Sequence, residues 1–404
     1  MASGVYGLRR LREPAFQRLL LVLLAIILVA FRLIQFTAFT TQVQWGYDFS
    51  FYWTAASHLL HGEPIYSAQQ LSGPYAPQGQ NGFLYPPPFA AAMTPFAIAF
   101  PDSYRAANWA WAAIGAVILV AGTWAVARSI GLFDRIRAAT GLGPWILFAA
   151  VVGFPPVVGE LVMGNVHILL FGLLAVAWLG IRQGDRMGEN WAGLAVGLAT
   201  VIKVFPALLI LWFVLTGRRR AATWSIIGVL FAIAATLPIT GVQPWLDFPV
   251  ALLNLSAPAD TTDTLAPTVW LAPLMGFGMG RLVVTAAALA ILAWTARRLP
   301  ARRSFVVAVL LSVLIAPALY HHYLAILVLP FLLLLPEAGA LPWLALAYLL
   351  MSGGEQTALG ELAWIVTRGL PTAGALLLLG VAIFNEAYRR EPVSPARPPE
   401  PTGA

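Results

Sequence analysis

The chain contains repeated long apolar runs, and these limit its possible folds more than any other feature. The first extends from Phe16 to Phe39, and others lie at about residues 105–127, 165–181, 221–239 and 281–297. A helix of about 20 apolar residues spans the hydrocarbon core of a bilayer. Because 60% of the residues are hydrophobic and only 10% are charged, the sequence predicts an all-α polytopic membrane protein.

Short arginine-rich stretches between the apolar runs predict the topology. Nineteen arginines fall in six such stretches: Arg9, Arg10, Arg12 and Arg18; Arg128, Arg135 and Arg137; Arg182 and Arg186; Arg218, Arg219 and Arg220; Arg297, Arg298, Arg302 and Arg303; Arg389, Arg390 and Arg397. Basic residues concentrate in cytoplasmic loops, so we expect both termini in the cytoplasm and residues 16–39 to be a retained first span. The net charge of +7 therefore reflects topology, and the sequence offers no nucleic-acid site.

This topology places two long regions outside the cytoplasm, residues 40–104 and 240–280. In the first of them, Asp48–Leu60 and Pro87–Phe100 have helical patterns rich in aromatic residues. Aromatic side chains suit the boundary between membrane and water, so we expect interfacial helices in this first loop.

Residues 191–216 are too few for two full crossings, although basic residues flank them on both sides. The sequence IKVFP interrupts this run, because proline disfavours helix at the residue before it. We therefore expect a re-entrant hairpin of two half-length helices with Lys203 near its tip. The whole pattern predicts one transmembrane domain, residues 1–390, followed by a proline-rich disordered cytoplasmic tail, residues 391–404.

Asp48 is a carboxylate among six aromatic residues, in the stretch WGYDFSFYW directly after the first span. An unpaired buried carboxylate is costly, so its presence needs a reason. It is either the cap of a following helix or a general base at the membrane surface. Lys203, the only lysine of the chain, presents a similar choice between a snorkelling structural cation and a partner for phosphate.

Other polar residues sit at the ends of apolar runs and have two possible explanations. Glu160, Asn165 and His167 lie around the turn GNVH, where they either satisfy backbone groups or contact a substrate. His321 and His322 lie where a span ends, and no HExxH pattern or carboxylate spacing accompanies them. With no cysteine in the chain and scattered acids, we expect neither a metal site nor a cofactor.

Several short motifs follow one another along the chain in a recognisable order. They are an aspartate after the first span, FLYPPPF (83–89), GNVH (164–167), IKVFP (202–206) and APALYHHY (316–323). This order resembles glycosyltransferase family 87, bacterial integral-membrane enzymes that include polyprenol-phosphate-mannose-dependent mannosyltransferases. The resemblance covers about residues 45–330. GNVH departs from the family's G-Q-x-N at two positions, and APALYHH keeps only the proline and the final histidine of its S-P-x-S-W-x-H.

The resemblance implies a type C glycosyltransferase fold of about 10–12 transmembrane helices in the bacterial plasma membrane, with an extracytoplasmic active site. It implies a polyprenyl-phosphate sugar donor, with mannose favoured, and a lipid or glycan acceptor. It also implies a catalytic acid in the first outer loop, which is Asp48 here. A single base acting in one displacement predicts inversion at the anomeric carbon. The rival prediction is a transporter or flippase of a lipid-linked sugar.

The remaining candidate residues divide into two groups. Those expected near the donor phosphate are Lys203, His322, His321, Arg281 and Arg32. Those expected to contact a substrate are Trp45, Tyr47, Tyr52, Tyr85, Glu160, Asn165 and His167. For the aromatic members, anchoring at the membrane interface is an equal alternative to stacking on a sugar.

Overall fold

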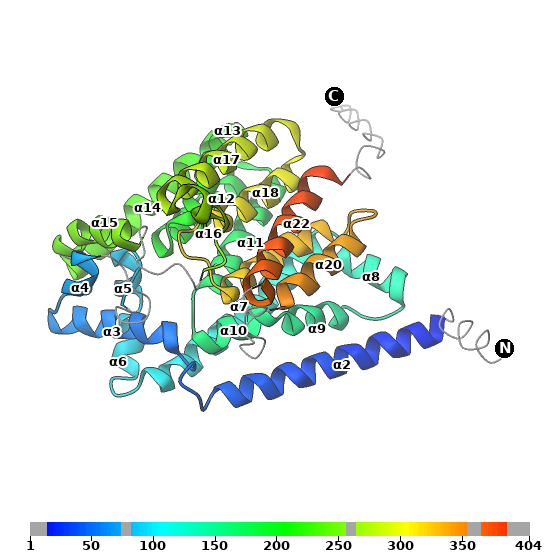
Figure 1. Cartoon of the computed structure of the whole chain (residues 1–404), viewed down its shortest axis with the longest axis horizontal. Helices are drawn as coiled ribbons and strands as arrows, with labels where there is room; N and C mark the ends of the chain where they lie inside the picture. Colours follow the sequence, from blue (N-terminus) through cyan, green and yellow to red (C-terminus); the bar gives the residue numbers. More distant parts are fainter. Residues whose placement is uncertain (1–13, 74–81, 256–263, 354–364, 386–404) are drawn as a thin grey trace, which may run out of the picture.

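A computed structural model describes residues 14–73, 82–255, 264–353 and 365–385, and these are helical with no strand (Figure 1). The first half contains α2 (Pro14–Phe39), α3 (Tyr47–His61), α4 (Ala68–Ser72), α5 (Pro87–Ala92), α6 (Thr94–Ala99), α7 (Tyr104–Ser129), α8 (Leu132–Thr140), α9 (Trp145–Gly153), α10 (Pro155–Met163), α11 (His167–Gln183) and α12 (Arg186–Ile202). The second half contains η1 (Phe205–Ala207), α13 (Leu208–Leu215), α14 (Arg219–Thr240), α15 (Gln243–Leu255), α16 (Thr268–Met275), α17 (Phe277–Arg298), α18 (Ala301–Leu314), η2 (His321–Leu327), α19 (Val328–Leu334), α20 (Leu341–Ser352), η3 (Ile365–Gly369) and α22 (Leu370–Phe384).

The all-helical membrane fold expected from the sequence is confirmed for the described residues. By length and composition, five helices in the described part of the chain are able to cross a membrane: α2, α7, α14, α17 and the segment Thr367–Phe384. The bent pairs α8 with α9 and α10 with α11 raise this number to seven if each pair is one span. This is fewer than the 10–12 spans expected, because several apolar runs form shorter helices such as α13, α19 and α20. The predicted C-terminal tail lies outside the described residues.

The interruption at Lys203 is confirmed and the helix after it is short as expected, but the helix before it is longer than the half-length helix predicted. The helix before the interruption, α12, has 17 residues and is therefore about 25 Å long. Gly193 of α12 lies against Ala221 of α14, and Gly197 lies against Ser225, so the two helices run in the same direction. The chain between them must return along the bundle through η1 and α13. Small residues permit this close approach of the two helix backbones.

The predicted first outer loop contains more helix than the sequence indicated. The helix expected at 48–60 is α3, and Gly62 ends it with a positive φ of 73°. The helix expected at 87–100 is divided into α5 and α6, because Pro95 interrupts the backbone hydrogen bonding near Met93. The short helix α4 was not expected.

The two regions predicted to be outer loops touch each other. Asn254 of α15 donates to the carbonyl oxygens of Gln70 and Leu71 in α4, at 2.8 and 3.1 Å. Helices α3 to α6 gather with α15 at one end of the molecule, and the N-terminal end of α2 lies with α8 at the other (Figure 1). The start of α2 and helix α8, which both carry arginine, thus lie at the opposite end of the molecule from this helix cluster (Figure 1).

Candidate active site

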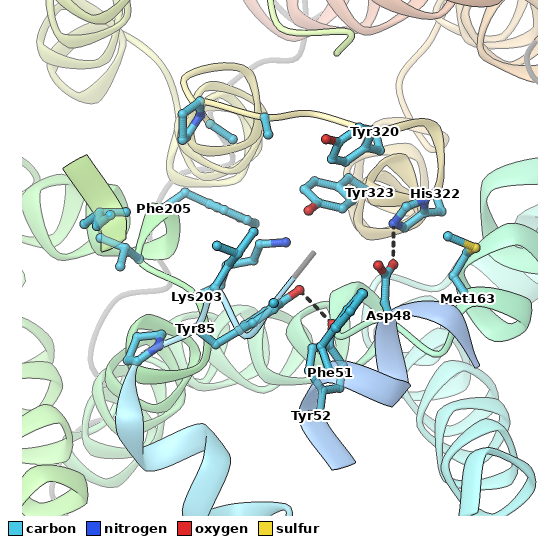
Figure 2. Close-up of a pocket in the computed structure, with 18 of the residues that line it drawn as sticks. Asp48, Phe51, Tyr52, Tyr85, Met163, Lys203, Phe205, Tyr320, His322 and Tyr323 are labelled. Atoms are coloured by element: carbon cyan, nitrogen blue, oxygen red, sulfur yellow. Dashed lines mark hydrogen bonds and ion pairs between the residues drawn. The ribbon is translucent and has the colours of Figure 1, made fainter. Parts of the chain in front are cut away.

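A cavity of about 470 Å³ lies where the first-loop helices meet the bundle. Its walls come from the start of α3, the segment 82–86, the end of α10, the non-helical segment after α12 at 203–205 and the segment 316–323 (Figure 2). Seven aromatic residues line it: Tyr47, Phe51, Tyr52, Tyr85, Phe205, Tyr320 and Tyr323. This size is typical of small-molecule sites. Among the described residues that line it, Asp48, Lys203 and His322 are the ionisable ones besides tyrosine.

The Asp48 carboxylate faces this cavity and does not cap α3. Gly46 is the residue at the helix N-cap, and no side chain makes a capping hydrogen bond there. Asp48 lies in the first turn, where the helix dipole favours a negative charge. Asn165 donates to its Oδ2 at 2.7 Å, and His322 Nε2 lies 3.1 Å from the same oxygen. Among the described residues, both contacts are to Oδ2 and none is recorded to Oδ1.

Two tyrosine hydroxyls form consecutive hydrogen bonds that end at the side-chain oxygen of Asn165. Tyr52 donates to the hydroxyl of Tyr85 at 2.7 Å, and Tyr85 donates to Asn165 Oδ1 at 3.2 Å. Burial raises the pKa of both phenols well above its usual value, and the negative charge of Asp48 adds to the rise. Both phenols therefore stay protonated and able to donate. These contacts fix the amide of Asn165 so that its Nδ2 points at Asp48.

Lys203 reaches the cavity from the break after α12. Its Nζ lies 3.6 Å from the centre of the Tyr323 ring and 5.2 Å from that of Tyr85, which are cation–π distances. It also lies 3.1 Å from His167 Nε2. The ammonium thus points into the space among the aromatic rings (Figure 2).

A single turn supports both charged groups. Gly164 ends α10 with a φ of 70°, and a Cβ there would collide with Asn108 and Phe49, so the turn requires glycine. Asn165 follows it and contacts Asp48, whereas His167 begins α11 and contacts Lys203. The GNVH turn therefore connects the carboxylate with the cation.

Other predicted site residues lie away from the cavity. Trp45 is buried against Phe36 and Trp109, and its indole donates to the carbonyl oxygen of Arg105 at 3.0 Å. His321 Nε2 lies 2.8 Å from the carbonyl oxygen of Met351. Arg32 donates to the carbonyl oxygen of Gly153 and to Gln35.

Arg281, on α17, does not line the cavity either, and Glu160 and His167 lie behind its wall. By contrast, Tyr47, Tyr52, Tyr85 and His322 line the cavity; the substrate and phosphate contacts that the sequence predicted for them stay predictions. Sequence reasoning missed Tyr323, whose ring lies closest to Lys203, although the aromatic setting of the histidine pair was a signal for it.

Fold and site together define an integral membrane protein whose cavity holds a carboxylate and a lysine beneath aromatic side chains. The model of glycosyltransferase family 87 matches residues 83–319, more than half of the chain. The chain belongs to this family, and the membership expected from its motifs is confirmed. The matched region includes Asn165 and Lys203 but begins after Asp48.

Two curated proteins are similar to parts of the chain. A polyprenol-phosphate-mannose-dependent alpha-(1-2)-phosphatidylinositol mannoside mannosyltransferase from Mycobacterium tuberculosis is 29% identical over 212 residues, covering 50% of this chain and 46% of the relative. An apolipoprotein N-acyltransferase from Parasynechococcus marenigrum is 38% identical over 71 residues, covering 16% of this chain and 15% of the relative. The chain thus spans less than half the length of these relatives in each match. No solved structure matches it.

Proposed function

We propose that this protein transfers a sugar from a polyprenyl-phosphate donor to a hydroxyl group of a lipid or glycan acceptor. The observation that carries the proposal is one cavity into which the Asp48 carboxylate and the Lys203 ammonium both project. Transfer from a lipid phosphate needs a base for the acceptor and a cation for the phosphate. Mannose is the proposed sugar because the mycobacterial relative is named for a polyprenol-phosphate-mannose donor.

In the proposed reaction, Asp48 removes the proton of the acceptor hydroxyl while the oxygen attacks the anomeric carbon. The bond between that carbon and the phosphate oxygen breaks, and polyprenyl phosphate leaves with the bonding electrons. Lys203 stabilises the charge that develops on the phosphate. Because a single displacement occurs, the anomeric configuration inverts.

His322 has a different role in this proposal from the phosphate contact expected from the sequence. Its Nε2 lies next to Asp48 Oδ2, as does Asn165 Nδ2. With Nε2 protonated, His322 is a second donor to this oxygen, and the two donors hold the carboxylate still and leave Oδ1 for the acceptor hydroxyl. We therefore assign His322 and Asn165 to orienting the base.

We also propose that the cavity faces the extracytoplasmic side of a bacterial plasma membrane and that both termini are cytoplasmic. Helix α11 begins at His167 beside the cavity, its last turn carries Arg182, and α12 begins at Arg186 just after it. Positively charged loops favour the cytoplasm, so the cavity end of α11 belongs on the opposite side. Reporter fusions test this topology: we expect Gln78 outside and Arg219 inside, and the reverse result contradicts it.

The central experiment is a transfer assay with purified protein in lipid and a panel of polyprenyl-phosphate sugars. We expect glycosylated acceptor from the mannose donor and its loss when Asp48 is replaced by asparagine. If the protein moves the lipid-linked sugar between leaflets without forming a glycosidic bond, it is a flippase and the proposal is wrong.

A further inference from the structure

Behind the cavity, three ionisable side chains from three segments form a continuous chain of contacts. Glu160 of α10 accepts a hydrogen bond from the backbone N–H of His167, and its Oε2 lies 3.1 Å from His167 Nδ1. His167 Nε2 lies 3.1 Å from Lys203 Nζ. The side chains of His167 and Glu160 are 0% and 1% exposed, and neither lines the cavity.

One assignment of the protons starts from Lys203 as an ammonium. An ammonium has only donors, so His167 Nε2 must be the acceptor. The single ring proton of a neutral imidazole then lies on Nδ1 and points at Glu160 Oε2. In this arrangement every contact pairs a donor with an acceptor, and the charge of Glu160 compensates that of Lys203 through the neutral ring.

We propose that Glu160 and His167 are positioning residues that hold Lys203 as an ammonium facing the donor phosphate. This inference rests on the proposed function for the identity of the phosphate, but the geometry of the three residues does not depend on it. It replaces the substrate contacts that the sequence predicted for Glu160 and His167, because their buried side chains do not reach the cavity.

Several other groups surround the ammonium and set its environment. Asp48 of α3 acts on it electrostatically, and Tyr85 and Tyr323 place their rings against it. His322 of η2 lies near the ring of His167, with the two ring centres 6.2 Å apart. Glu160 and Asp48 are the negative groups in this set, so removing the charge of Glu160 destabilises the ammonium.

The single lysine allows a test that needs no enzymatic activity. The intact protein in lipid is labelled with acetic anhydride at a series of pH values, and mass spectrometry measures acetylation of Lys203. Only the amine form reacts. We expect Glu160→Gln and His167→Leu to lower the midpoint of the labelling curve by about one pH unit or more. His167→Gln, which keeps an acceptor for the ammonium, should shift it less.

Glu337→Gln is the matched control, because Glu337 is a buried glutamate paired with Arg303 at the start of α18, whereas the cavity is lined by the segment that follows the end of this helix. It should lower thermal stability without moving the labelling midpoint of Lys203. If Glu160→Gln, His167→Leu and His167→Gln all keep the wild-type midpoint, Lys203 is held as an amine with the proton on Glu160. The inference is then overturned.

Steady-state kinetics then test whether Glu160 and His167 affect the binding of the sugar donor. We expect His167→Leu to raise KM for the polyprenyl-phosphate sugar about tenfold, while KM for the acceptor stays unchanged. An equal rise in both KM values overturns the assignment to the donor phosphate. A wild-type protein that transfers no sugar contradicts the proposed function instead. The shift of the labelling midpoint still reports on the contacts among Glu160, His167 and Lys203.

Discussion

Two hollows of similar size have opposite chemistry in this molecule. The cavity of about 470 Å³ brings together a carboxylate, a lysine, a histidine and several tyrosines. A groove of about 380 Å³ between α2, α9, α19 and α20 is lined by apolar side chains and Tyr348. The hydroxyl of Tyr348 donates to the carbonyl oxygen of Ala150, so even this polar atom is satisfied within the protein.

The difference between them indicates where the protein carries out chemistry. Helix α10 runs from one to the other: its N-cap Phe154 lines the groove, and its last residue Met163 lines the cavity. An apolar groove needs no particular partner in a bilayer, since lipid tails are as apolar as its walls. Charged groups at membrane depth are costly and need fixed partners. The network around Asp48 and Lys203 is therefore a feature that packing alone does not require.

Replacing Asp48 by asparagine should have the largest effect on the cavity. The change keeps the shape of the side chain but removes the base, so we expect transfer to fall about 1,000-fold with normal folding and membrane insertion. Initial rates with a polyprenyl-phosphate mannose donor measure it. Glu63→Gln is the control, because Glu63 is an acid of the same loop that is 59% exposed and pairs with His58. A variant that retains transfer would remove Asp48 from the mechanism.

Lys203→Met should follow, with an effect concentrated on the donor. The substitution keeps an unbranched stem but removes the cation, so we expect kcat/KM for the donor to fall about 100-fold. Kinetics in which each substrate is varied separately measure this effect, and the acceptor KM should change little. Equal losses for both substrates would contradict the phosphate role of Lys203.

A matched pair of tyrosine variants compares the two hollows directly. Tyr85→Phe removes the donor to Asn165 Oδ1, and loss of one hydrogen bond predicts an approximately fivefold lower kcat. Tyr348→Phe removes the donor to Ala150 at the groove and should leave kcat unchanged. Thermal unfolding of both proteins separates a rate effect from lost stability. Equal rates for the two variants would show that the hydrogen bond from Tyr85 to Asn165 does not help to position Asp48.

The sequence predicted the main residues of the site because single polar groups stand out in apolar surroundings. Asp48, Lys203 and the GNVH turn were recognisable in this way, and all of them meet at the cavity or its wall. The helix of Asp48 and the break at Lys203 were also predictable from local signals, namely a glycine stop and a proline.

The partners of these residues were not predictable, because they depend on packing between distant segments. Asn165 lies 117 residues from Asp48 in the sequence and 157 from His322, and no local pattern links them. The sequence therefore assigned Asn165 to a substrate and His322 to a phosphate. The packing of α14 against α12 was hidden for the same reason, since it depends on contacts between glycines and small residues of two helices.

The smallest effect should come from filling the groove. Ala345 lines it and is exposed, so Ala345→Leu adds apolar volume without removing a hydrogen bond. Because lipid tails are as apolar as this surface, we expect kcat and both KM values to stay within about twofold of the wild type. Kinetics with a long-chain donor, a short-chain donor and a lipid acceptor measure it. A selective rise in KM for one lipid substrate would make the groove a binding site for that lipid's chain, and the contrast between the two hollows would then be one between binding a lipid tail and reacting with its head group.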